Sequence, residues 1–285
     1  VGPQVENVGL LDLSRGNWTI TVEVDDDLLC KESAPDATCS EDLVVEGPPE
    51  ILVTHLEFDG DIIDQQPSEN DGEFIGEPEP VFAPDRNGNA GSAASFDGID
   101  DYVSLQHNEG LPLTAHTAFS IAMWVRGPVG QRDMRIFSEA STTNNTPLFN
   151  LGTHNRGANG ALDGYIRGNG GALLNHTYST SMVFDDTWHH IVWSDNNGQV
   201  VLYVDGVVDG TDFSYNRAAM DVNTTTIGGI LRADPSYWFT GEIDEVRLFN
   251  FSLDQDDVDE VYTEAPGGCG PPSFALEFSG ASDQA

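Results

Sequence analysis

The chain has 285 residues, with 11 Lys and Arg against 48 Asp and Glu, and a formal net charge of −37. This length corresponds to one large all-β domain or two ordinary domains, and it is ample for a packed core. Acidic charge at this density makes nucleic acid and anionic lipid poor partners, and no apolar run is long enough for membrane insertion. The charge suits solubility, a salty medium or cation binding.

Residues 1–47 have the pattern of the end of a small β domain. The segments "NWTITVEVDDD" and "DLVVE" predict two strands. Two or three strands cannot close a core, so the rest of this domain is expected upstream. The pair resembles the last hairpin of an immunoglobulin-like or PKD-type module. The chain also begins without Met and carries no signal peptide, so we expect it to be a segment of a longer protein.

A short loop between these strands contains two cysteines. Cys30 and Cys39 bound the segment "CKESAPDATC" at the expected end of a hairpin. This arrangement predicts a disulfide and an oxidising compartment, and the alternative is two free thiols. Cys269 is left over and has no evident partner within the chain.

Residues 48–266 consist of strand and turn patterns, after a linker "GPPE" at 47–50. In "FSIAMWVRG" the apolar residues alternate, and NNG at 196–198 and DG at 205–206 predict tight hairpin turns. Parallel folds need helices between strands, and no such helices are evident here. We therefore predict an all-β, two-sheet antiparallel sandwich.

One short helix is predicted near the end of this domain. The segment "SLDQDDVDEVYT" offers Ser252 as N-cap, followed by acidic residues in the first turn. Leu253, Val258, Val261 and Tyr262 form a short apolar stripe. The helix is expected to pack at the end of the sandwich.

Residues 267–285 form a linker and one further strand pattern. "ALEFSGASDQA" is similar to the earlier segments "HLEFDGDIID" and "ASFDGIDDYVSL", and each of the three has an aromatic residue before a Gly turn. The repeat predicts the first strand of a following module of the same type. The alternative is a strand that is added to the sheet of a neighbouring copy.

Six sequence segments, in the order in which they occur, resemble the type-3 laminin G-like domains of the concanavalin A-like jelly rolls. They are "LEFDGDIID", "GSAASFDGIDDYVSL", "FSIAMWVRG", "DDTWHHIVWSDNNGQVVLYVDGVV", "IGGI" and "FTGEIDEVRLFNFSLDQDDVDEVY". The resemblance implies a jelly roll of a secreted or surface protein that binds carbohydrate or protein or serves as a spacer. It also implies that a rim Ca²⁺ is common.

The segment "GEIDEVRLFN" is similar to the catalytic strand of laminarinase-type glucanases. Those enzymes need acids at alternate positions of one strand. Glu242 and Asp244 have that spacing, but the next position is Val246, or Arg247 if the strand carries a bulge. Neither is acidic, so no catalytic residue is predicted and the chain is expected not to be an enzyme.

Asp244 is instead predicted to be a calcium ligand. In a regular strand it shares a face with Val246 and Leu248, where a buried carboxylate needs a backbone N–H or a cation. The loops that carry Asp59, Asp64 and Asp97 offer further oxygens for a structural Ca²⁺. The alternative is that the FDG aspartates only form turns.

Sugar binding needs an aromatic platform with polar neighbours. The candidates are Trp238 and Tyr237 in "DPSYWFTG", and Tyr215 with Asn216, with polar contacts from the loop at 141–160. The alternative is that these aromatics belong to the core, where we place Trp124, Trp188 and Trp193. The histidines are not expected to form a zinc site.

Together these features predict a non-catalytic adhesion, carbohydrate-binding or protein-binding module of a large extracellular or cell-surface protein. One alternative is a structural protomer of a filament or surface layer, which self-associates with neighbouring copies. Another is an accessory domain of a polysaccharide-degrading enzyme.

Overall fold

The computed structural model describes residues 51–78, 81–209 and 213–264, together with the backbone of 19–23 and 40–44. It divides into two units, Val1–Glu50 and Ile51–Ala285. In the first unit, β1 (Thr19–Glu23) and β2 (Ser40–Val44) pair antiparallel. Cys30, Cys39, Cys269 and the segment 267–285 lie outside the described residues. The disulfide and both flanking modules therefore stay predictions.

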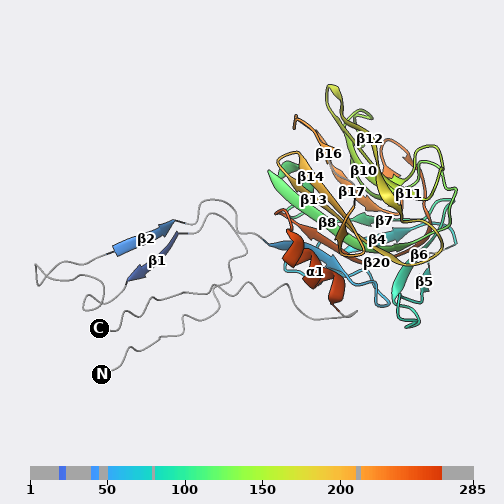
Figure 1. Cartoon of the computed structure of the whole chain (residues 1–285), viewed down its shortest axis with the longest axis horizontal. Coiled ribbons are helices and arrows are strands. Elements are labelled where there is room, and N and C mark those ends of the chain that lie inside the picture. Colours follow the sequence, from blue (N-terminus) through green and yellow to red (C-terminus); the bar gives the residue numbers. More distant parts are fainter. Residues whose placement is uncertain (1–18, 24–39, 45–50, 79–80, 210–212, 265–285) are drawn as a thin grey trace, which may run out of the picture. The chain divides into compact units, whose positions relative to one another are not determined.

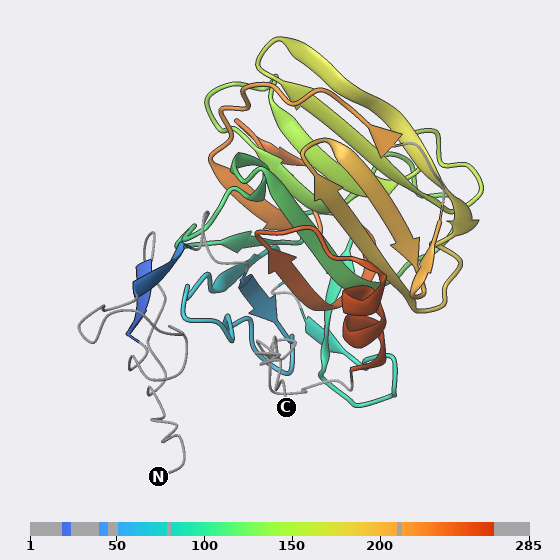
Figure 2. The same cartoon turned by 60° about the vertical axis from the view of Figure 1, so that its left-hand side comes forward.

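The second unit is a sandwich of two antiparallel sheets, as the sequence predicts (Figure 1). The first sheet has seven strands, in the order β12 (Gly171–Met182), β11 (Ala161–Gly168), β10 (Leu148–Thr153), β9 (Arg135–Ala140), β17 (Thr224–Ile227), β7 (Tyr102–Leu105) and β4 (Gly72–Ile75). The long strands β11 and β12 lie side by side at one edge of this sheet (Figure 2).

The second sheet has nine strands. Its order is β15 (Val207–Val208), β14 (Gln199–Val204), β13 (His189–Asn196), β8 (Ala118–Arg126), β20 (Thr240–Phe249), β6 (Ala93–Asp97) and β5 (Val81–Ala83), while β16 (Phe213–Ser214) pairs with β14 and β3 (Leu52–Leu56) with β20. A 3-10 turn, η1 (Leu113–Ala115), precedes β8, and a small hairpin of β18 (Ile230–Leu231) and β19 (Pro235–Ser236) precedes β20.

The core lies between the two sheets and follows the predicted alternation. Phe119, Ile121, Met123 and Val125 of β8 are all fully buried. Trp193 belongs to the same cluster, where Gly164 makes room for it, because a Cβ there would lie 2.5 Å from the indole. Trp124 and Trp188 were expected in the core, but both are half-buried outside it.

The predicted hairpin turns are present where Asn, Asp and Gly tolerate positive φ. Asn197 and Gly198 have φ of 53° and 82° in the turn between β13 and β14. Asp205 and Gly206, between β14 and β15, have φ of 52° and 77°. These turns fix the register of the strands that they join.

Helix α1 (Gln255–Thr263) differs from the prediction in its cap and in its place. Asp254, not Ser252, is the N-cap, since its side chain accepts from the backbone N–H groups of Asp256 and Asp257. The apolar side chains of the helix pack on residues of β8, β13 and β20 that face away from the core. The helix therefore covers the outer face of the nine-stranded sheet instead of the end of the sandwich (Figure 1). No helix in the described part of the chain is long and apolar enough to span a membrane.

A bulge in β20 overturns the predicted faces of this strand. Asp244 pairs with Trp124, but Arg247 pairs with Ala122, and Glu245 between them has φ of 51°. The extra residue shifts the alternation by one position. Val246 and Leu248 lie in the core, whereas Asp244 is placed with Arg247 on the outer face.

Candidate functional site

The two acids of the glucanase-like strand are both engaged in ion pairs. Arg126 Nε lies 3.0 Å from Glu242 Oε2, and Arg86 Nη1 lies 3.1 Å from Asp244 Oδ2. Because of the bulge, Glu245 and Arg247 follow on the same outer face, where the carboxylate of Glu245 contacts Arg247 and His55. All three acids of this strand thus have a basic side chain as partner.

Asp244 has a cationic partner of a kind that the sequence analysis did not expect. We predicted a backbone N–H or a metal ion, which no observation tests; the guanidinium of Arg86 contacts Oδ2, while Oδ1 is buried and has no hydrogen-bond partner among the described residues. Burial raises the pKa of Asp244 to about 8, and the neighbouring charge of Glu245 adds to this effect, while Arg86 opposes it.

The other predicted calcium ligands occupy separate turns. The carboxylate of Asp64 accepts from the backbone N–H groups of His55, Gln66 and Asn70 and from Ser68 Oγ. Asp97 accepts from the N–H of Ile99 at 2.7 Å, in the local turn that the alternative interpretation describes. Asp59 is exposed.

Two carboxylate clusters with metal-ligand spacing occur in the described part of the chain. The first consists of Asp97, Asp100 and Asp101, and the second of Asp133, Asp163 and His176. Asp97 is therefore a predicted calcium ligand that belongs to one of these clusters. Asp101 is buried, and its Oδ1 has no hydrogen-bond partner among the described residues.

The predicted sugar-binding residues divide between two hollows. Tyr215 and Asn216 line a hollow of about 610 Å³ beside the β13–β14 turn. However, Tyr215 is only 8% exposed, and its hydroxyl donates to Asp195 Oδ2 at 2.6 Å. Its ring belongs to the core and offers no free face to a sugar, which corrects its assignment as a binding platform.

The second hollow is smaller, about 120 Å³, and lies on the face of the seven-stranded sheet that points away from the core. Its walls come from β9, β10, β11, β12 and the β18–β19 hairpin: Asp133, Arg135, Leu148, Asn150, Tyr165, Arg167, His176, Ile230, Arg232 and Tyr237. Tyr237 is 36% exposed, so one predicted residue does present its ring at this hollow. Trp238, the next residue, is half-buried and is not part of its wall.

The floor of this hollow is built from buried polar groups. Arg135 and Asn150, which line the hollow, are 6% and 2% exposed, and Asp163, the partner of His176, is 3% exposed; none of the three belongs to the core. Gly152 on β10 stands opposite both Arg135 and Asp163, and a Cβ there would meet the carbonyl of Met134 at 1.9 Å. The missing side chain lets β9 and β11 bring their charged groups together across β10.

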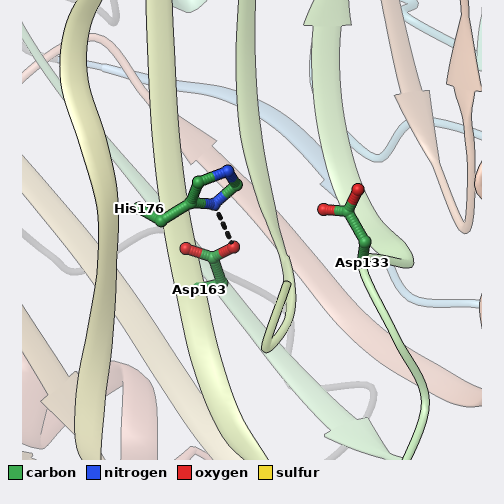
Figure 3. A group of neighbouring side chains, drawn as sticks. All are labelled: Asp133, Asp163 and His176. Carbon is green, nitrogen blue, oxygen red and sulfur yellow. Dashed lines mark hydrogen bonds and ion pairs between the residues drawn. The ribbon is translucent and has the colours of Figure 1, made fainter. Parts of the chain in front are cut away.

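The buried charges of the floor form two pairs. Arg135 Nη2 lies 2.8 Å from Asp133 Oδ1, and His176 Nδ1 lies 2.6 Å from Asp163 Oδ2. Figure 3 shows the carboxylate of Asp133 turned toward the second pair. Burial raises the pKa of Asp163 to about 6, against the opposing effect of His176.

The amide of Asn150 completes this network. In the orientation that satisfies both of its atoms, it donates to Ser138 Oγ at 3.0 Å and accepts from Arg135 Nε at 3.3 Å. Buried polar groups that are satisfied in this way hold their side chains rigidly. Arg135 and Asn150 are therefore fixed in place before any ligand binds.

Aromatic rings and guanidinium groups form the walls. The rings of Tyr165 and His176 stack with centroids 4.3 Å apart and planes 6° apart. The guanidinium groups of Arg135 and Arg232 lie over the ring of Tyr237, at 4.8 and 5.4 Å from its centroid. Such stacking fixes the side chains at low entropic cost and leaves their polar edges for a ligand.

Most of this site was missed from the sequence, although one signal was present. In "ALDGYIRG" of β11, Asp163, Tyr165 and Arg167 alternate with residues that face the core. A strand whose outward positions carry an acid, an aromatic and an arginine is a signal for a binding face. His176, for which the sequence suggested no site, lies on β12 beside Asp163.

Solved structures with the same fold include domain 4 of AbnA, a GH43 extracellular arabinanase from Geobacillus stearothermophilus, in complex with arabinotriose. It superposes with a TM-score of 0.57 at 21% identity, over 75% of this chain and 98% of that domain. The receptor binding domain of the botulinum neurotoxin C/D mosaic serotype gives a TM-score of 0.56 at 11% identity, over 74% of this chain and 50% of its own. The binding domain of Paraclostridial Mosquitocidal Protein 1 gives a TM-score of 0.56 at 14% identity, over 74% of this chain and 51% of its own.

The chain thus spans about half of the toxin binding domains that it matches. At these identities the likeness shows the fold alone. No curated protein sequence gives a significant match. The model of a protein family, described as the concanavalin A-like lectin/glucanases superfamily, matches residues 97–259, which is more than half of the chain. The chain therefore belongs to this superfamily, in its Laminin_G_3 family.

Proposed function

We propose that the jelly roll is a non-catalytic carbohydrate-binding module of an extracellular or surface protein, and that the hollow beside Tyr237 is its binding site. The observation that carries this proposal is the preorganised polar floor beneath an exposed aromatic ring. Binding sites for small ligands combine such an apolar surface with a few fixed polar groups. At about 120 Å³ the hollow holds one unit or substituent of a larger glycan that continues along the sheet.

The test is a glycan array followed by calorimetry with the whole chain. We expect Tyr237→Ala to weaken binding about tenfold, because the ring supplies the apolar contact. Asn216→Ala, in the larger hollow, is the matched control and is expected to leave the affinity unchanged. Loss of binding in Asn216→Ala alone would move the site to that hollow. Failure to bind any glycan would contradict the proposed function.

We also retain the structural Ca²⁺ as a proposal, now at Asp97, Asp100 and Asp101. The support is that their oxygens lie within 4.8 Å of one another and that Asp101 Oδ1 is buried without a partner among the described residues. Calcium that binds the native state alone must raise the melting temperature. We expect EDTA to lower this temperature in the native sequence but not in Asp101→Asn. Equal melting curves with Ca²⁺ and with EDTA would remove the proposal.

A further inference from the structure

Arginine is concentrated at the proposed binding site. The chain has only 11 Lys and Arg against 48 Asp and Glu, yet Arg135, Arg167 and Arg232 line the same hollow. A solvated surface on so acidic a chain would distribute these few cations among its many carboxylates. Because three arginines line one hollow, their charges bear on the chemistry of its ligand.

The charges of the hollow are only partly compensated from within. Arg135 is paired with Asp133, and Asp163 with His176. Arg167 and Arg232 form no ion pair with any carboxylate of the described residues. The Nη2 of Arg167 donates to the carbonyl of Asn145 at 2.8 Å, and its Nε is buried without a partner in that part of the chain. The Nη2 of Arg232 donates to Ser236 Oγ at 3.3 Å.

The unmatched groups define the chemistry of the missing partner. Each guanidinium has five donors in a rigid fork that fits a carboxylate. Asp163 Oδ1 is also buried and has no partner among the described residues, but Asp163 does not line the hollow. A ligand that complements the free donors of Arg167 and Arg232 carries an anionic group.

A divalent cation fits the same hollow less well. The oxygens of Asp133 and Asp163 and the nitrogen of His176 have suitable spacing. However, Arg135 lies 2.8 Å from Asp133, and a bound cation would have to displace it or accept its repulsion. Figure 3 shows that the hydrogen bond of His176 is already directed at Asp163.

We infer that this hollow recognises the carboxylate of an acidic sugar, a uronic acid unit of a glycan, through Arg167 and Arg232. The inference rests on the proposed carbohydrate-binding function and names the class of its ligand. In this arrangement the carboxylate lies between the two guanidinium groups. Tyr165 stays in place through its stack on His176 and the guanidinium of Arg167, 5.8 Å from the centroid of its ring.

The test is calorimetry in EDTA, with galacturonate, glucuronate and mannuronate trisaccharides, their methyl esters and the corresponding neutral trisaccharides. The methyl ester removes the charge but keeps the sugar. We expect at least one acidic trisaccharide to bind, and its ester to bind at least about tenfold more weakly. Arg167→Gln and Arg232→Gln are each expected to lose about tenfold for the acid and little for the ester.

Arg156→Gln is the matched control, since it makes the same change of charge at an exposed arginine that does not line the hollow. Its affinity is expected to equal that of the native chain, and far-ultraviolet circular dichroism checks that each variant is folded. Equal binding of acid, ester and neutral sugar would overturn the inference but leave the proposed function standing. Binding of a sulfated galactotriose, with no uronate bound, would overturn the assignment to a carboxylate. Absence of binding to every saccharide would overturn both proposals.

Discussion

The guanidinium of Arg247 lies 2.7 Å from the carboxylate of Glu264, which ties strand β20 to the residue that follows helix α1. The same guanidinium donates to Glu245 at 2.9 Å, and Glu245 also contacts His55 of β3 at 2.7 Å. This network became possible because the bulge places Glu245 and Arg247 together on the outer face. It joins three elements from opposite ends of the domain.

Removal of Arg247 is therefore expected to destabilise the domain strongly. Arg247→Met leaves the buried Glu245 without this cationic partner, and breaking such a pair costs about 3–5 kcal/mol in free energy of unfolding. Glu264→Gln, which keeps an acceptor at the more exposed end, should cost about 1 kcal/mol or less. Urea unfolding followed by tryptophan fluorescence measures both. Equal losses in the two variants would show that the network does not carry this stability.

The N-cap of helix α1 gives a second test. Asp254→Ala removes the acceptor for the backbone N–H groups of Asp256 and Asp257, and is expected to cost about 1 kcal/mol. Ser252→Ala is the control at the position that the sequence favoured, with an expected change within about 0.5 kcal/mol. The midpoint of urea unfolding reports both effects. A larger loss in Ser252→Ala would contradict the capping assignment.

Gly152 is expected to be required for both stability and binding. In Gly152→Ala the methyl group meets the carbonyl of Met134 at 1.9 Å, so β9 must move and the contact of Arg135 with Asp133 is disturbed. We expect a loss of about 1–3 kcal/mol in unfolding free energy, with weaker glycan binding. Gly170→Ala is the matched control, because nothing lies within 4 Å of its added Cβ. A Gly152→Ala variant with native melting and binding would refute the close approach.

The stability of the domain should fall as the pH rises from about 6.5 to 8; below that range the buried His190, whose pKa burial lowers to about 3, acts in the opposite direction. Burial raises the pKa of Asp163 to about 6, of Glu139 to about 7 and of Asp244 to about 8. An acid whose folded pKa exceeds its unfolded value of about 4 binds its proton more tightly in the folded state. The stabilisation by these protons is thus complete below pH 4 and is lost as the pH rises through the folded values.

Melting temperatures measured from pH 5 to pH 9 check this sign. The native chain should melt at a lower temperature at the alkaline end, and relief of acidic self-repulsion at low pH acts in the same direction. Asp244→Asn removes the titration with the highest pKa, so the decrease above pH 7 should become shallower. A melting temperature that rises from pH 7 to pH 9 would contradict the proposed protonation of these acids.

The architecture was accessible from the sequence because it depends on local patterns. Alternation in "FSIAMWVRG" places Phe119, Ile121, Met123 and Val125 in the core, and Asn-Gly and Asp-Gly pairs mark the turns. The helix was found for the same reason, although its cap was misassigned. Two acceptors, Ser252 and Asp254, precede the same apolar stripe, and only the tertiary packing selects between them.

The proposed binding site could not be found in this way, because it joins residues that are distant in the sequence. Asp133, Asp163 and His176 come from three segments that meet only through the strand order β9, β10, β11 and β12, and through the absence of a side chain at Gly152. Alternation fixes which face a side chain takes, but not which strands are neighbours.

The sequence by itself thus determined the sandwich, its core and its turns, since each is encoded in a few consecutive residues. The tertiary structure decided the rest. One extra residue in β20 places Asp244 and Arg247 on the outer face, where Asp244 contacts Arg86 and Arg247 contacts Glu245. Strand order then brought three arginines to one hollow, because charges far apart in the chain become neighbours only when the sheet has formed.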